Sequence, residues 1–188
     1  MPGGDKMTAR LKEKYLKEIM PDLKREFNYK NIHQTPKLTK IIVNSGVGKS
    51  TSDPKILEVV KEAIKKITGQ SPITTSAKKS VAGFKLREGQ KIGVKVTLRG
   101  ERMYEFLDKL ISYALPRIRD FRGLSKDAID KEGNYSVGVR DCTIFPEVEF
   151  EDVLSGLGLQ INIVTSASNI EESKKLLLLL GVPIKEEQ

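Results

Sequence analysis

Apolar and polar residues alternate most regularly in residues 92–99. The apolar members fall at every second position, which is the period of a strand with one buried face. The polar set includes Lys95, Thr97 and Arg99, so the outer face of this strand is predicted to be cationic. Shorter patterns of the same kind predict strands over residues 38–44, 72–76, 135–139 and 159–164.

Helical spacing of apolar residues begins early in the chain. Residues 8–27 carry such a stripe, which Pro21 is expected to break or restart because proline lacks the N–H that a helix interior uses. A second stripe predicts a helix that starts at Pro54, a residue suited to the first helical position, and stops at Gly69. The expected capping residues of this helix are Ser52 and Asp53.

Two more helices follow the regular strand. The first is predicted over residues 101–115 and is closed by Pro116. In the second, Ser168 with Glu171 matches a capping box, and Gly181 marks the end. The solvent-exposed ion pair expected on the first of these helices is Glu105 with Lys109.

These elements predict the fold class. Helices and strands are mixed without a regular βαβ alternation, which favours an α+β fold. We expect two layers, a mostly antiparallel sheet with helices packed on one side and an open polar face on the other. Residues 8–188 are predicted to form a single domain, and residues 1–7 a disordered extension. No internal repeat is apparent.

Charge along the chain points to an anionic partner. The 188 residues carry a formal net charge of +8, with 33 Lys and Arg against 25 Asp and Glu. Residues 1–70 and 71–140 each have a net charge of +7, whereas residues 141–188 have −6. Such asymmetry steers an anionic polymer to one face of a protein.

Several classes of protein are disfavoured. No apolar run is long enough to cross a bilayer, and residues 1–10 contain no apolar stretch of a secretory signal, so we expect a cytoplasmic protein without a membrane partner. The single Cys142 and the single His33 argue against a disulfide or a zinc enzyme. We expect no catalytic residue, metal, cofactor or small-molecule substrate. His33 is interpreted as exposed or hydrogen-bonded, and Cys142 as buried or half-buried.

The segment after the first predicted strand resembles a phosphate-binding P-loop, because Gly46 and Gly48 precede Lys49-Ser50. The spacing fails, since the position that requires the first glycine is Val43. The predicted helix also starts several residues after the position at which a P-loop helix begins. A nucleotide hydrolase therefore stays only an alternative, and these glycines are better explained by close approach of a larger partner.

Nucleic acid is the partner that the remaining pattern favours. If the polar sides of the strands align, Lys40 and Asn44 join Lys95, Thr97 and Arg99, with Gln160 and Asn162 at the far edge. Such a face offers cations to phosphates, and amides and hydroxyls to sugars and bases. Structured RNA suits it better than B-form DNA, because no predicted helix is basic enough to enter a major groove. An ordinary solvated antiparallel face is the simpler alternative.

A second cationic feature strengthens this interpretation. The glycine-rich segment 77–91 holds five basic residues and one acidic residue, which is too polar for a core. Two separate basic regions suggest two contacts. The basic residues are Lys78, Lys79, Lys85, Arg87 and Lys91.

Longer motifs then identify a family. Residues 43–48 (VNSGVG), 77–85 (AKKSVAGFK), 95–103 (KVTLRGERM), 116–124 (PRIRDFRGL) and 133–136 (GNYS), with Thr68-Gly69-Gln70 and Ile144-Phe145-Pro146-Glu147, resemble in order the bacterial large-subunit ribosomal protein number five family. The resemblance runs from about residue 15 to residue 183. Ser45 and Ser71 depart from it, since methionine and lysine are common there.

This resemblance implies a non-enzymatic protein that binds 5S rRNA in the central protuberance of the large subunit, beside 23S rRNA, and that contacts the P-site tRNA and a protein of the small-subunit head. The family's RNA contacts match Asn44, Gln70 and Thr97. A non-ribosomal RNA chaperone is a further alternative. With neighbours chosen on physical grounds, the expected 5S rRNA site is Lys40, Asn44, Gly46, Gln70, Lys95, Thr97 and Arg99.

Two other sites follow from the same resemblance. The expected tRNA-binding loop contains Lys78, Lys79, Ser80, Gly83, Phe84 and Lys85. The expected intersubunit contact contains Arg117, Arg119, Asp120, Phe121 and Arg122.

Overall fold

The computed structural model describes residues 9–48, 54–119, 121–148 and 157–185. The strands are β1 (Leu38–Gly46), β2 (Ile73–Ser76), β3 (Lys91–Leu98), β4 (Tyr135–Val139) and β5 (Leu159–Thr165). The α-helices are α1 (Arg10–Lys14), α2 (Met20–Glu26), α3 (Pro54–Thr68), α4 (Gly100–Lys109) and α5 (Ile170–Leu179). All five predicted strand segments are therefore strands, and β1 runs to Gly46, two residues beyond its prediction.

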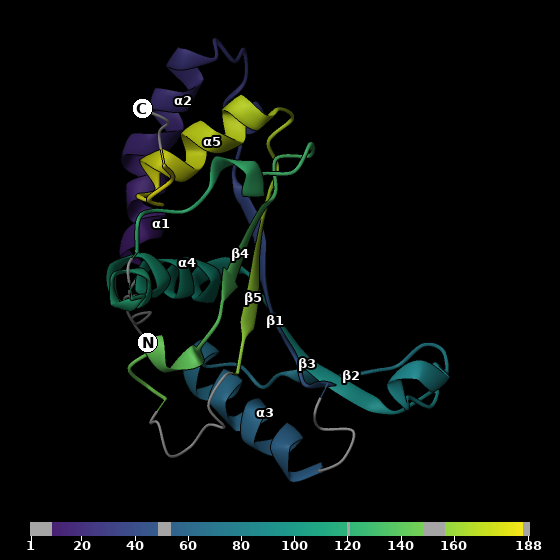
Figure 1. Ribbon diagram of the computed structural model, residues 1–188. Coiled ribbons are helices and arrows are strands. Elements are labelled where there is room, and N and C mark those ends of the chain that lie inside the picture. The colour runs from purple at the N-terminus through teal and green to yellow at the C-terminus, as the bar shows by residue number, and fades with distance from the viewer. Residues whose placement is uncertain (1–8, 49–53, 120, 149–156, 186–188) are drawn as a thin grey trace, which may run out of the picture.

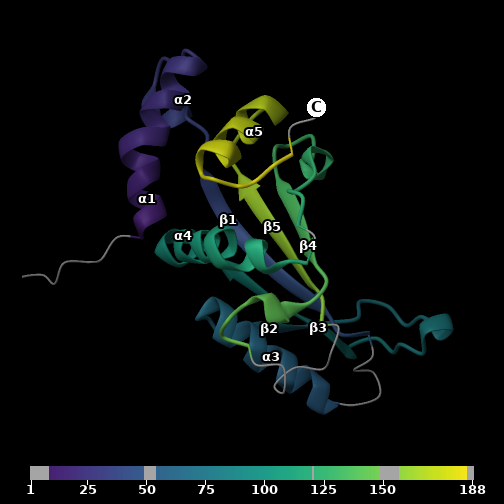
Figure 2. The same ribbon diagram turned by 60° about the vertical axis from the view of Figure 1, so that its left-hand side comes forward.

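The strands form one antiparallel sheet in the order β2-β3-β1-β5-β4. The helices lie together on one side of it (Figures 1 and 2). Within the described residues, the opposite face carries no α-helix. This is the predicted α+β architecture with an open face. We call that side the open face throughout.

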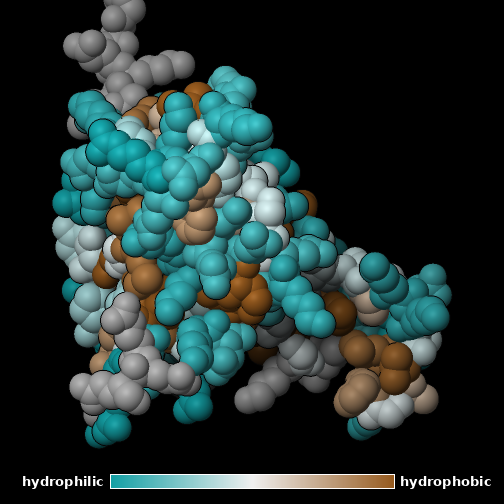
Figure 3. All heavy atoms as spheres, turned by 90° about the horizontal axis from the view of Figure 1, so that it is seen from above, coloured by the Kyte–Doolittle hydropathy of each residue, from teal (hydrophilic) through white to brown (hydrophobic). Residues whose placement is uncertain are grey.

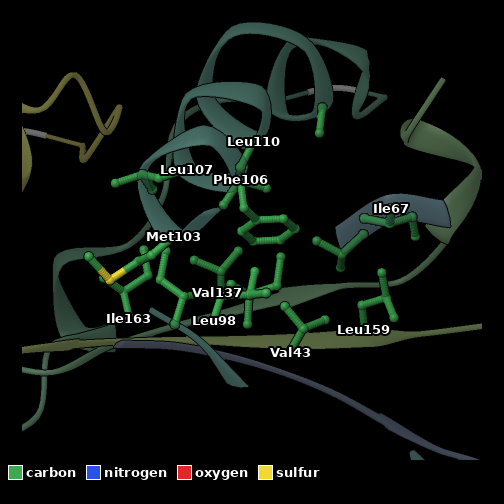
Figure 4. Packing of buried hydrophobic residues seen from close by; sticks show 14 of the residues in the cluster. Val43, Ile67, Leu98, Met103, Phe106, Leu107, Leu110, Val137, Leu159 and Ile163 are labelled. Atoms are coloured by element: carbon green, nitrogen blue, oxygen red, sulfur yellow. The ribbon is translucent and has the colours of Figure 1, made fainter. Parts of the chain in front are cut away.

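The core fills the space between the sheet and the helices. Strand residues such as Val43, Leu98 and Ile163 are fully buried and point toward α4 (Figure 4). Phe106 of α4 reaches down onto them, and its ring stacks on Phe145 with the centroids 6.1 Å apart. Burial of alternate residues on each strand fixes which side chains reach the open face, because a shift of one residue would expose the whole apolar set.

The first helical segment is continuous through Pro21. A π-helical turn, Tyr15–Ile19, joins α1 to α2, and such wider turns accommodate a proline that cannot make the regular hydrogen bond. The predicted break at Pro21 is therefore absent, whereas the predicted restart agrees with α2, which begins at Met20 and has Pro21 in its first turn. Pro116 likewise lies inside a 3-10 turn, Leu115–Arg117, after a π turn at the end of α4.

The start of α5 also differs from its prediction. The cap is Asn169 instead of Ser168. Glu172, three residues after Asn169, accepts a hydrogen bond from the Ser168 N–H at 2.9 Å. Ser168 and Asn169 are both common capping residues, and each is followed three positions later by a glutamate. The sequence pattern therefore fits two helix starts that differ by one residue. The start of α3 at Pro54 and the left-handed φ of +66° at Gly69 agree with prediction, whereas Ser52 and Asp53 lie outside the described residues, as do residues 1–7.

Lys109 has an unexpected set of partners. Its Nζ donates to the Glu147 carboxylate and to the Ile67 carbonyl, both at 2.6 Å. Its side chain is only 25% exposed, so it ties the end of α3 and the segment after Phe145 to α4. The sequence prediction of a surface pair with Glu105 was wrong, because both real partners are distant in sequence.

Replacing Lys109 with methionine should destabilise the fold. The change leaves the buried side of the Glu147 carboxylate and the Ile67 carbonyl without their donor, which costs about 1–3 kcal/mol. Urea unfolding followed by circular dichroism should show a lower midpoint with an unchanged slope. Lys61→Met on α3 is the control, because its partner Glu58 is 64% exposed; an equal loss in both variants would contradict the anchoring role.

None of the helices in the described part of the chain is long and apolar enough to span a bilayer. The buried residues form one cluster that includes all the strands except β2 and reaches α1, α2, α3, α4 and α5. A single domain over residues 8–188 stays a prediction that this continuous cluster supports.

Candidate nucleic-acid interface

The strand register brings the predicted polar residues together on the open face. Asn44 lies opposite Lys95 on one side and opposite Gln160 on the other. Ile42 lies between Thr97 and Asn162 in the same way. One row across all five strands is Ile73, Lys95, Asn44, Gln160 and Gly138, and the next is Thr97, Ile42, Asn162 and Ser136.

The strands contribute only positive charge to this face. Lys95 and Arg99 are exposed and Lys40 is half-buried. Arg99 follows the end of β3 with extended backbone, φ −142° and ψ 163°, and so continues its alternation. No acidic side chain projects from the described strands onto this face. A polyanion therefore meets cations and neutral hydrogen-bonding groups without a repelling carboxylate from these strands.

Gln70 occupies the end of the sheet near Thr97. Its Nε2 donates to the Thr97 carbonyl at 3.2 Å. The pairing of β2 with β3 begins at Ile73 and Lys95, so Gln70 supplies a partner where β2 does not reach. Thr68 holds the same turn, because its hydroxyl donates to the Ile64 carbonyl at 2.7 Å. Gln70 thus has a fixed position beside Thr97, and its Oε1 is the atom it can offer to a ligand.

The glycine turn after β1 does not have P-loop geometry in its described part. Val47 donates from its backbone N–H to the Ile92 carbonyl at 2.9 Å, so the turn stays attached to β3. The α3 helix spans Pro54–Thr68, which is too late for its first N–H groups to cradle a phosphate held at Gly48. Lys49, Ser50 and Thr51 lie outside the described residues.

The basic segment 77–91 is an ordered extension of the β2–β3 hairpin. Backbone bonds link Ala77 to Gln90 and, in both directions, Val81 to Leu86. Lys85 takes a left-handed conformation at the tip, with φ +54°. Ser80 accepts a hydrogen bond from the Glu88 N–H at 2.9 Å, so its hydroxyl helps to hold the hairpin. The basic residues are thus presented on a formed structure and not on an unstructured loop.

The hairpin projects well beyond the body of the protein (Figures 1 and 2). Its tip combines charge with apolar surface: Phe84 is 76% exposed and Val81 is 41% exposed. Figure 3 shows hydrophobic atoms at a projecting end of the molecule, next to hydrophilic ones. Lys78, Lys79 and Lys85 are all exposed. A basic arm with an aromatic tip can contact phosphates and also pack on a base or ribose.

The predicted intersubunit segment divides into two kinds of residue. Arg117, Arg119 and Arg122 are exposed, whereas Phe121 is half-buried and packs against the core. Asp120 lies outside the described residues. The arginines are therefore the described members that can meet a partner, and Phe121 fixes the segment to the body.

The single histidine and cysteine are placed as expected. His33 is exposed in a 3-10 turn, where its backbone N–H donates to Asn31. Cys142 is fully buried, and burial together with Asp141 raises the pKa of its thiol to about 11. It is thus a packing residue without thiolate character near neutral pH. Within the described residues, no group of three or more His, Cys, Asp or Glu side chains could hold a metal ion.

Sequence reasoning did not assign a role to the outer face of β4. Ser136 and Gly138 alternate there with three buried residues, and this alternation of polar or small residues with apolar ones is visible in the sequence. Their position beside Asn162 and Gln160 depends on the pairing of β4 with β5, which sequence alone did not give.

An α+β fold with two cationic surfaces is typical of proteins that bind RNA. Comparison with known families makes this specific. Residues 31–87 match the family described as ribosomal protein L5, and residues 91–184 match the model of the C-terminus of the same ribosomal family. The second match alone spans half of the chain. The chain belongs to the ribosomal protein L5 family.

Membership establishes the general role. The family consists of structural, non-enzymatic constituents of the large ribosomal subunit. Ribosomal RNA of that subunit is its partner, and the ribosome is its location. The boundary between the two matched regions falls within the β2–β3 hairpin, and both regions contribute strands to the same sheet.

Proposed function

We propose that the open face binds 5S rRNA, and that the chain belongs to the bacterial branch of its family. The observation that carries the first proposal is the row of Lys95, Asn44 and Gln160 across neighbouring strands, on a face to which the described strands contribute no carboxylate. The bacterial assignment is supported by the long motifs of residues 77–85 and 116–124.

Binding combines two physical contributions. Lys40, Lys95 and Arg99 neutralise phosphates, which supplies most of the affinity. Asn44 and Thr97 offer an amide and a hydroxyl that can bond to ribose or base edges and so fix the position of the RNA. The sheet holds these groups rigidly, because their strands are paired on both sides.

The projecting hairpin is proposed to contact the P-site tRNA. Its tip lies away from the middle of the open face (Figure 2), so one protein can hold one RNA on the sheet and reach a second with the arm. In this proposal Lys78, Lys79 and Lys85 contact phosphates of the tRNA, and Phe84 packs against an apolar surface of it. The exposed Arg117, Arg119 and Arg122 are proposed to face the small-subunit head.

The affinity for 5S rRNA should fall steeply with salt. With on the order of 5 phosphate contacts, log K against log salt has a slope of roughly −3 to −5, because each contact releases condensed counterions. Filter binding of a 5S rRNA transcript over a series of KCl concentrations measures this slope. An affinity independent of salt would overturn the electrostatic account.

Competition distinguishes the ribosomal role from a general RNA chaperone. Unlabelled 5S rRNA should displace the labelled transcript at much lower concentration than a folded RNA of similar size. Equal displacement by both RNAs would favour the chaperone, since only a specific site discriminates between folded RNAs.

A further inference from the structure

For two glycines on the open face, the part of the chain that the structure describes offers no steric reason. A side-chain Cβ at Gly46 or at Gly138 would meet nothing within 4 Å, and neither residue has a positive φ. Gly93 is different, because a Cβ there would lie 2.8 Å from the Thr75 hydroxyl and 3.0 Å from the Ser45 carbonyl. Glycine inside a strand is destabilising compared with alanine, so Gly46 and Gly138 point to a requirement outside the folded chain.

Gly138 is the more informative of the two. Gly46 ends β1 beside a turn, whereas Gly138 lies inside β4, opposite Gln160. Its neighbours Val137 and Val139 are buried, so the missing side chain would project from the open face. The backbone of β4 is therefore bare at this point, and a ligand can come into direct contact with it.

A fixed amide lies in the adjacent row. The Ser136 hydroxyl donates to Asn162 Oδ1 at 3.0 Å across the β4–β5 pair. This bond uses one lone pair of the amide oxygen and orients the side chain, so that Asn162 can offer its Nδ2 donor to a ligand. Phosphate oxygens, the 2′-hydroxyl and base carbonyls all accept such a bond.

The register connects this area to the cationic strands. Gly138 shares a row with Gln160, Asn44 and Lys95, and Asn162 shares the next row with Thr97. Neighbouring strands are about 4.8 Å apart, so a row across five strands spans about 19 Å. A single RNA strand or groove edge can thus lie across the whole sheet.

We infer that β4 and β5 form a second, uncharged part of the RNA site, in which RNA contacts the bare backbone at Gly138 and accepts a hydrogen bond from Asn162. This inference rests on the proposed binding of 5S rRNA by the open face. It adds positioning groups on β4 and β5 to Asn44 and Thr97, whereas the charge comes from Lys40 on β1, Lys95 on β3 and Arg99 directly after β3.

Replacing Gly138 with alanine should have opposite effects on the stability of the protein and on its affinity for RNA. Gly138→Ala should leave the melting temperature unchanged or raise it, because the new methyl group meets no atom of the protein and alanine suits a strand better. Affinity for a 5S rRNA transcript should fall about tenfold, since the methyl group separates the RNA from the backbone. Ser112→Thr is the control, because it also adds one methyl group to an exposed residue, in the turn at the end of α4 on the helical side, and it should bind the transcript normally.

The amide test keeps the side-chain shape. Asn162→Asp replaces the Nδ2 donor by an anionic oxygen and should lower affinity about tenfold or more. Asn31→Asp makes the same change on the exposed connection between α2 and β1, and should leave binding unchanged. The aspartate variant also tests the contact if Gly138→Ala lowers the melting temperature.

Comparison with a charge variant separates this inference from the proposed function. If Gly138→Ala and Asn162→Asp both bind as the unchanged protein does while Lys95→Ala/Arg99→Ala loses binding, the extension onto β4 and β5 is wrong and the sheet face stands. If the charge variant also binds normally, both fail. Loss of affinity in all three, with normal binding by the two controls, supports the extension.

Discussion

Replacing Lys95 and Arg99 together with alanine should weaken binding of 5S rRNA by roughly 30- to 1000-fold. Each charged contact to a phosphate contributes about 1–2 kcal/mol, and every 1.4 kcal/mol is a factor of about ten. Both residues are exposed on β3 or directly after it, so their loss should leave the core and the melting temperature nearly unchanged. Filter binding at fixed salt measures the effect, and the slope of affinity against salt should become shallower.

A matched variant shows whether position or net charge matters. Lys24 and Arg25 are also one lysine and one arginine, both exposed, on α2 in the helical layer. Lys24→Ala/Arg25→Ala removes the same charge and should bind 5S rRNA with nearly normal affinity. Equal loss in the two double variants would show that the protein attracts RNA only by its overall charge.

Removing the charges of the hairpin should affect the other RNA. The triple change of Lys78, Lys79 and Lys85 to alanine is expected to weaken the P-site tRNA contact by up to about 3 kcal/mol, since exposed ionic contacts contribute about 1 kcal/mol or less each. Binding of 5S rRNA should stay normal, because the hairpin projects away from the body of the sheet (Figure 1). The dissociation rate of tRNA from the P site of ribosomes reconstituted with the variant measures the effect.

The control for this experiment removes three lysines elsewhere. Lys14, Lys24 and Lys30 are exposed on the N-terminal helices and the turn that follows, and their replacement should leave tRNA dissociation unchanged. If the hairpin variant loses 5S rRNA binding instead, the two proposed sites are one. If tRNA dissociates at the normal rate, the hairpin does not hold it.

Local patterns predicted much of this fold because they depend on the chain's immediate neighbours. The alternation in residues 92–99 became β3, and the apolar stripe after Pro54 became α3 with its end at Gly69. The same reasoning did not predict the π turn that joins α1 to α2 before Pro21, and it failed at Lys109, where the partners are an α3 carbonyl and Glu147. Those outcomes depend on packing between elements, which a short window of sequence does not contain.

The sequence by itself determined which residue types face solvent on each strand, where the positive charge concentrates, and that no recognisable catalytic pattern is present. Only the tertiary structure decided that β1 lies between β3 and β5, because strand order is set by contacts between distant segments. That order places Asn44 between Lys95 and Gln160 and extends the row to Gly138. This order joins separate polar positions into one continuous surface. The segment of five basic residues forms a projecting arm because its ends are held by the β2–β3 pair.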